Sequence, residues 1–299
     1  MAVSVVALVA AVTVTVARPR CRWGTFLYMV GIETENQEDW RRDAVVLDEG
    51  EERFVTDDHA AWDVGLSPEG DRVVVAKAEG GNDSEYDSPE MTGLFTYDLD
   101  GSNEVELDAI GNHPEWSPDG AEIAFMTGRK VKVVTVEDKA EREVFRLRPS
   151  DAAGRRYLND IAWSADSSEI AVAVGHNAGS TIWTVKADGS DRTRVQDVDD
   201  SLLHSLEWSS DGAFAWAGQY KGVFSVLVAE ASGNVMQVEP NSTDPAWSSD
   251  GTQLAYVIGD EGHYAPRIVV GDARGQGEQP VPIPDGARGG GSLEDWASC

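Results

Sequence analysis

The chain contains little cysteine and few basic residues. Its two cysteines, Cys21 and Cys299, stand near opposite ends, which excludes a disulfide framework and a thiolate-rich metal site. Lys and Arg total 24 against 53 Asp and Glu, so the formal net charge is −29. Nucleic acids and anionic membranes bind through basic patches, and we expect neither as a partner. Basic proteins, cations or adaptation to high salt remain compatible with this charge.

The signatures of several common enzyme classes are also missing. The sequence has no Gly-x-Ser-x-Gly nucleophile elbow, no Gly-x-Gly-x-x-Gly fingerprint, no phosphate-binding loop and no His-Glu-x-x-His. The missing elbow argues against a serine peptidase. We therefore expect no catalysis of these types.

The longest apolar run spans residues 2–17 and is followed by Arg18, Arg20 and Arg22. It lacks the basic residues that precede a signal core, and it is short for a membrane span. Three interpretations stay open: an atypical signal or anchor, an anchor with its arginines and the rest of the chain in the cytoplasm, or a β-rich segment of the fold. We interpret residues 1–22 as a signal or anchor, which predicts an extracytoplasmic protein, either periplasmic, secreted or membrane-anchored. A cytoplasmic location is the alternative.

What the sequence does contain is one short element that recurs along most of its length. Its best copy runs from Trp116 to Gly120 (Trp-Ser-Pro-Asp-Gly) and precedes the apolar residues 123–126. Pro presets φ, Asp bonds its own backbone and Gly supplies a positive φ, so the element predicts a strand, a tight turn and a second strand. The element recurs at Leu66, Trp163, Trp208 and Trp247. A period of about 40 to 50 residues with four strands per repeat is typical of a β-propeller.

The repeat resembles that of the TolB-like (WD-like) β-propellers, whose consensus centres on Trp-Ser-Pro-Asp-Gly followed by an Ile-Ala-Phe-like strand. The match is best between Trp116 and Phe125 and extends over nearly the whole chain. The resemblance implies a propeller that is often exported. Propellers of this kind serve as binding modules, as accessory domains and, occasionally, as enzymes.

The repeats predict an all-β fold, a six-bladed β-propeller of four-stranded antiparallel blades. We expect it to occupy residues 23–299 as a single domain and a monomer. The five continuous blades are predicted at residues 59–110, 111–153, 157–200, 203–241 and 243–285.

The sixth blade is predicted to join the two ends of the chain. The strands predicted within residues 26–55 lack an inner strand, and residues 292–298 resemble residues 205–210, with Trp296 in register with the repeat. Pairing this C-terminal strand with the N-terminal strands would remove both free sheet edges. The same closure would bring Cys21 near Cys299.

One set of polar residues recurs near the position three residues before the repeated Trp. In a propeller this segment enters the innermost strand, so its residues converge on one mouth of the central channel. Carboxylates there would suit Ca²⁺, and Asp with His would suit Zn²⁺ or Mn²⁺. In the alternative interpretation each Asp caps a turn or binds the backbone of a neighbouring blade. The candidate metal ring consists of Asp63, His113, Asp160, His204 and Asp244, with His59 in the first of these segments.

The repeated tryptophans occupy equivalent inner positions, and we expect them to be wedges between blades rather than a stacking platform for sugars or bases. They are Trp116, Trp163, Trp208, Trp247 and Trp296.

We interpret the chain as a non-catalytic propeller module for protein–protein interaction or ligand binding. It needs no cofactor in this interpretation, although Ca²⁺ or another divalent cation would fit the central channel. Its partner is expected to be a protein or a small ligand, and residues 2–17 would provide membrane attachment. The alternative is a metal-dependent, lyase-like propeller enzyme that acts at the channel mouth. A third interpretation is the sensor part of a larger assembly.

Overall fold

The computed structural model describes most of the chain, including every predicted blade. The described residues are 25–32, 41–48, 51–79, 90–149, 156–177, 179–199, 203–230, 233–248, 250–259, 267–281 and 293–297. The apolar segment 2–17, Cys21 and Cys299 lie outside these stretches, so the predictions about them stay predictions. Within these stretches no helix is long and apolar enough to cross a membrane.

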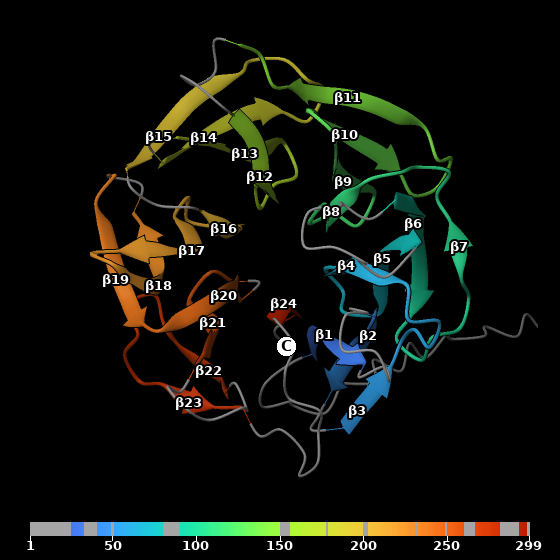
Figure 1. Cartoon of the computed structure of the whole chain (residues 1–299), viewed down its shortest axis with the longest axis horizontal. Coiled ribbons are helices and arrows are strands. Elements are labelled where there is room, and N and C mark those ends of the chain that lie inside the picture. Colours follow the sequence, from blue (N-terminus) through green and yellow to red (C-terminus); the bar gives the residue numbers. More distant parts are fainter. Residues whose placement is uncertain are drawn as a thin grey trace, which may run out of the picture.

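Six antiparallel sheets of four strands stand radially around a common centre (Figure 1). This arrangement confirms the predicted six-bladed, all-β propeller. Blade 1 consists of β4 (Ala61–Leu66), β5 (Arg72–Glu79), β6 (Glu90–Asp98) and β7 (Val105–Glu106). Blade 2 consists of β8 (Asn112–Trp116), β9 (Glu122–Thr127), β10 (Lys130–Thr135) and β11 (Glu141–Arg146). Blade 3 consists of β12 (Arg156–Trp163), β13 (Glu169–His176), β14 (Gly179–Lys186) and β15 (Thr193–Asp199).

The remaining three sheets complete the ring. Blade 4 consists of β16 (His204–Trp208), β17 (Phe214–Tyr220), β18 (Val223–Ala229) and β19 (Val235–Pro240). Blade 5 consists of β20 (Ser242–Trp247), β21 (Gln253–Ile258), β22 (Arg267–Asp272) and β23 (Gln279–Pro280). The closing blade combines β24 (Leu293–Ala297) with β1 (Thr25–Ile32), β2 (Arg41–Asp48) and β3 (Glu51–Phe54).

The closing blade joins the two ends of the chain as predicted. Its strand order is β24-β1-β2-β3, with β24 and β1 antiparallel and Trp296 opposite Phe26. Figure 1 places β24 next to the centre, between β20 and β4. This C-terminal strand is therefore the inner strand of the closing blade. It fills the position between the inner strands of blade 5 and blade 1, so the ring is closed there.

The repeated turn has the chemistry expected from its residues. In blade 2, Gly120 has φ 71° and donates its N–H to the carbonyl of Ser117 at 2.8 Å. The carboxylate of Asp119 accepts the N–H of Ala121 at 3.0 Å and the hydroxyl of Ser117 at 2.6 Å. These bonds satisfy the polar groups of the turn within the turn itself. The chain reversal therefore does not depend on contacts with other elements.

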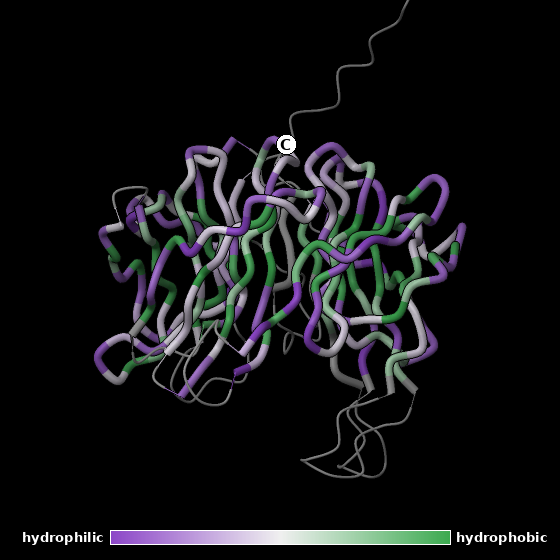
Figure 2. Tube along the Cα trace, turned by 90° about the horizontal axis from the view of Figure 1, so that it is seen from above, coloured by the Kyte–Doolittle hydropathy of each residue, from purple (hydrophilic) through white to green (hydrophobic). Residues whose placement is uncertain are grey.

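The core lies between the blades, where the four repeated Trp side chains that the structure describes pack against the preceding blade. Hydrophobic residues follow the strands and hydrophilic ones gather at the turns (Figure 2). Trp116, for example, is 6% exposed and shares a cluster with Val74 and Leu94 of blade 1. Trp163 donates its indole N–H to the carbonyl of Glu115 in blade 2 at 3.1 Å. The prediction of inter-blade wedges is confirmed for the described Trp side chains, which do not include that of Trp296.

Candidate functional site

A cavity of about 260 Å³ opens at the channel mouth where the inner strands begin. Its lining includes the whole predicted set, one residue from each of five inner strands. The members are Asp63 in β4, His113 in β8, Asp160 in β12, His204 in β16 and Asp244 in β20. We call this end of the channel the Asp/His mouth.

An irregularity in each inner strand turns these residues toward the mouth. The register shifts lie between Ala61 and Asp63, Asn112 and Glu115, Leu158 and Asp160, His204 and Glu207, and Thr243 and Ala246. A β-bulge of this kind bends the strand and changes the direction of a side chain. Three bulge residues have left-handed backbones, with φ 48° at His113, 52° at Ser205 and 51° at Asp244. This conformation costs a non-glycine residue roughly 1 kcal/mol or more, so tertiary contacts hold it in place.

Two of the aspartates link neighbouring blades. Asp63 accepts the N–H of Val64 in its own strand at 3.0 Å and the N–H of His113 in blade 2 at 2.9 Å. Asp160 accepts the N–H of Ile161 at 2.8 Å and the N–H of Leu206 in blade 4 at 2.8 Å. Both carboxylates therefore satisfy two backbone donors, which is the structural role that the alternative interpretation predicted.

His113 lies between these two carboxylates. Its Nδ1 is 3.3 Å from Asp63 Oδ2 and 3.7 Å from Asp160 Oδ1. Burial alone would lower the pKa of His113, but the charges of Asp63 and Asp160 outweigh it, and the pKa lies above its ordinary value. Burial raises the pKa of Asp160. The imidazole thus links the carboxylates of blade 1 and blade 3 from its place in blade 2.

The remaining predicted residues make fewer contacts with one another. Asp244 accepts a hydrogen bond from the hydroxyl of Ser205 at 3.2 Å, and the ring of His204 lies 6.3 Å from that of Phe224. Over the part of the chain that the structure describes, no three His, Cys, Asp or Glu side chains are grouped to hold one metal ion. The five side chains therefore share a cavity without forming a ligand set in this conformation.

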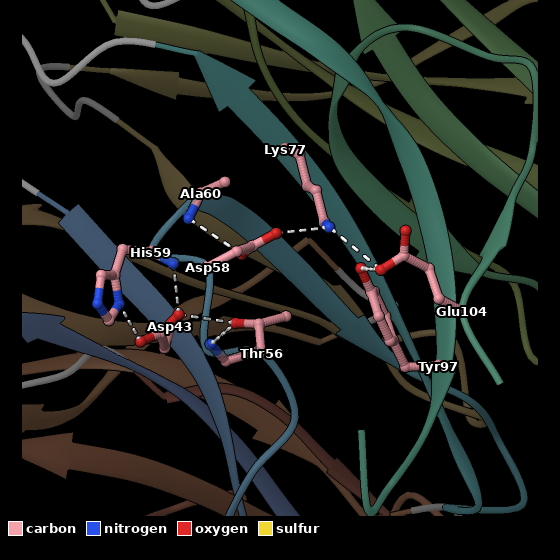
Figure 3. A network of polar contacts seen from close by, with 9 residues as sticks. Asp43, Thr56, Asp58, His59, Ala60, Lys77, Tyr97 and Glu104 are labelled. Carbon is pink, nitrogen blue, oxygen red and sulfur yellow. Dashed lines mark hydrogen bonds and ion pairs between the residues drawn. The ribbon is translucent and has the colours of Figure 1, made fainter. Parts of the chain in front are cut away.

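His59 belongs to a different network. Its Nδ1 lies 2.6 Å from Asp43 Oδ2, and its backbone N–H donates to Asp43 Oδ1 at 2.9 Å (Figure 3). The hydroxyl of Thr56 donates to the same carboxylate at 3.1 Å. These bonds tie β2 of the closing blade to the segment that enters blade 1, and His59 is not part of the lining of the mouth.

Sequence reasoning missed several residues that line the Asp/His mouth. They include Arg42, Trp62, Glu115, Asn159 and Glu207. Trp62 and Asn159 are adjacent to predicted positions, and the two glutamates lie two or three residues after predicted positions in the same inner strands, so a search of these strands would have found all four. Arg42 is the second residue of β2, the third strand of the closing blade, and alignment on the inner-strand Trp could not have found it.

The other end of the channel has a different chemistry. A cavity of about 390 Å³ there is lined by Trp116, Trp163, Trp208 and Trp247 together with residues of the repeated turns. Glu115, Leu206 and Glu207 line both cavities, so the two cavities meet at these residues. The channel thus has a charged mouth and an aromatic mouth.

Comparisons with known proteins support the fold and leave the activity open. No family model matches the sequence. A relative in Bacillus subtilis (strain 168), described as the uncharacterized peptidase YuxL, is 28% identical over 153 residues. The match covers 48% of this chain and 21% of YuxL, so the chain spans about a fifth of that relative's length.

Solved structures share the propeller at low sequence identity. TolB from Acinetobacter baumannii has a TM-score of 0.66 and 14% identity, over 91% of this chain and 66% of that one. An oligogalacturonate lyase in complex with manganese has a TM-score of 0.54 and 13% identity, over 86% of this chain and 73% of that one. At these identities the likeness shows the fold alone, and it confirms the resemblance to TolB-like propellers.

Proposed function

We propose that this chain, a six-bladed β-propeller with the TolB-like fold, is a non-catalytic module that binds its partner or ligand at the Asp/His mouth. The observation that carries the proposal is the gathering of Asp63, His113, Asp160, His204 and Asp244 around one cavity. Concave sites with convergent polar groups are the usual places of ligand binding. The left-handed bulge residues support the same proposal, because strained backbone is concentrated at functional sites.

A metal-dependent enzyme at the same mouth is the second candidate, since three aspartates and two histidines line the cavity. Three features weaken it. Asp63 and Asp160 already accept two backbone N–H groups each. Among the described residues no three ligands are grouped. Arg42 brings a fixed positive charge to the lining.

The proposal includes an extracytoplasmic location, a monomeric state and a partner other than nucleic acid. The net charge of −29 supports the last point, because nucleic acids repel a surface of this charge. The location follows from interpreting residues 1–22 as a signal or anchor. Fractionation of the native cells tests it, and recovery of the chain in the cytoplasmic fraction would contradict it.

Site-specific photo-crosslinking tests binding at the mouth. A photoreactive residue replaces His204 at the mouth or Val195, which is 48% exposed on the outer strand β15. We expect a partner or ligand to cross-link from position 204, and the Asp244→Asn variant to weaken this reaction. Equal cross-linking from both positions, or none from position 204, contradicts the proposal.

Divalent ions separate the binding module from the metal enzyme. If the aspartates hold a metal, Ca²⁺ or Mn²⁺ raises the melting temperature of the parent protein by mass action, and the Asp160→Asn/Asp244→Asn double variant loses this response. We expect neither protein to respond. A response that only the parent shows would favour the metal-dependent enzyme.

A further inference from the structure

Arg42 is the one permanent cation in the lining of the Asp/His mouth, as the structure describes it. Its guanidinium carbon lies 5.6 Å from the centre of the Trp62 ring, and Trp62 lines the same cavity. A guanidinium stacked on an aromatic face keeps its edge N–H donors available for a planar acceptor. The pair therefore presents a rigid site for a carboxylate.

Three described aspartates near Arg42 or Trp62 in the sequence have partners of their own, and Figure 3 shows two of them, Asp43 and Asp58. Asp43 binds Thr56 and His59, as described above, and Asp58 pairs with Lys77 at 2.7 Å. Asp63 binds the backbone and the ring of His113. No ion pair joins Arg42 to a carboxylate of the described residues. Within the described part of the chain, the guanidinium is thus available to a ligand.

The charge around Arg42 limits which ligand would bind. Five carboxylates line the same cavity, those of Asp63, Glu115, Asp160, Glu207 and Asp244. A simple anion would be attracted by Arg42 and repelled by these groups. A simple cation would be attracted by the carboxylates and repelled by Arg42. A molecule that carries both charges satisfies the two sides of the mouth together.

We propose that the Asp/His mouth binds a small zwitterion, an amino acid or a similar amino carboxylate. The carboxylate of the ligand pairs with Arg42 over Trp62, and its ammonium group faces the surrounding carboxylates. The cavity of about 260 Å³ lies below the roughly 300–1,000 Å³ of sites for drug-sized ligands, which fits a molecule of this size. This inference rests on the proposed binding function and adds the chemical class of the ligand.

Calorimetric titration of the full chain with matched probes tests the inference. The probes are 4-aminobutyrate and 6-aminohexanoate, each compared with the amine and the carboxylate of the same chain length. At least one amino carboxylate is expected to bind about tenfold or more tightly than either of its singly charged counterparts, since each of its two charges adds a charge-assisted hydrogen bond.

Three variants test whether Arg42 is the group that binds the ligand carboxylate. Arg42→Gln should weaken amino carboxylate binding about tenfold or more, and it should not weaken amine binding, because it removes a charge that repels a cation. Arg42→Lys, which keeps the charge without the planar fork, should bind amino carboxylates with an affinity between those of Arg42→Gln and the parent. Arg274→Gln makes the same charge change at a side chain that is 67% exposed and away from the lining, and it should have no effect. Melting curves of each variant establish that it is folded.

The outcomes separate this inference from the proposed function. If amines bind as tightly as amino carboxylates and only Asp244→Asn weakens them, the mouth is a binding site but the zwitterion inference is wrong. If Arg42→Gln changes binding no more than Arg274→Gln, the inference is also wrong. If no probe binds in a way that Asp244→Asn weakens, both proposals lose their support.

Discussion

The repeated tryptophans offer a matched test of how the blades hold together. Trp163 is 6% exposed and donates its indole N–H to the carbonyl of Glu115 in the preceding blade at 3.1 Å. Trp247 occupies the equivalent position in blade 5 and is 8% exposed, but its Nε1 is buried without a hydrogen-bond partner among the described residues. Replacement by Phe removes the same atoms at both positions.

The two substitutions should therefore differ mainly in their hydrogen bonds. The apolar area lost is similar at both sites and cancels in the comparison. Trp163→Phe loses a hydrogen bond with a net value of about 0.5–1.5 kcal/mol. Trp247→Phe removes a buried donor that has no partner, and this relieves a desolvation cost of about 1–3 kcal/mol. We expect Trp163→Phe to destabilise the propeller by at least about 1.5 kcal/mol more than Trp247→Phe.

Chemical denaturation followed by circular dichroism measures this difference, with thermal melting as a second observable. For domains of 150–250 residues, 1 kcal/mol corresponds to about 2–4 °C, so the melting temperatures should differ by about 3 °C or more. Trp183→Phe is a useful control, because the Nε1 of Trp183 is also buried and lacks a partner among the described residues. Equal destabilisation at positions 163 and 247, or a larger loss at 247, would refute the reasoning.

Three further predictions concern the mouth, the closing strand and the charge. The raised pKa of His113 means that its stabilising contribution is complete below its unfolded pKa of about 6.5 and is lost as the pH rises through its higher folded pKa. Urea denaturation from pH 5.5 to 8.5 should show this loss in the parent and not in His113→Gln, and parallel profiles would contradict it. Deletion of residues 292–299 removes the inner strand β24 from the closing blade, so the melting temperature should fall by more than removal of a loose tail would cause; an unchanged melting curve would contradict the closure. The net charge of −29 repels itself in the folded state, so added KCl should raise the melting temperature, and a flat response would mean that the acidic residues are already paired.

The architecture could be predicted because its signals are local and repeated. Each Ser-x-Asp-Gly turn is satisfied by bonds among its own residues, such as those of Ser117, Asp119 and Gly120. The spacing of the turns then counts the blades. The resemblance of residues 292–298 to residues 205–210 predicted the closing strand, because an inner strand keeps the same pattern wherever it stands in the chain.

The positions of the five predicted mouth residues could also be inferred, since rotational repetition brings equivalent positions to one rim. Their interactions could not. Asp63 and Asp160 accept backbone N–H groups of neighbouring blades, and these bonds depend on how adjacent sheets are rotated and on the bulges at their ends. His59 lies in the same kind of segment as the predicted residues, yet the nearby Asp43 binds it outside the lining.

By itself, the sequence determined the all-β class, the six blades, the closure of the ring and the mouth at which charged residues gather. These follow from turn chemistry and periodicity, which act over a few residues at a time. Only the tertiary structure decided that Arg42, from the third strand of the closing blade, stacks on Trp62 from blade 1 beside those charges. The contact joins two neighbouring sheets, and it depends on how these sheets are rotated relative to each other, so no local pattern in the sequence encodes it.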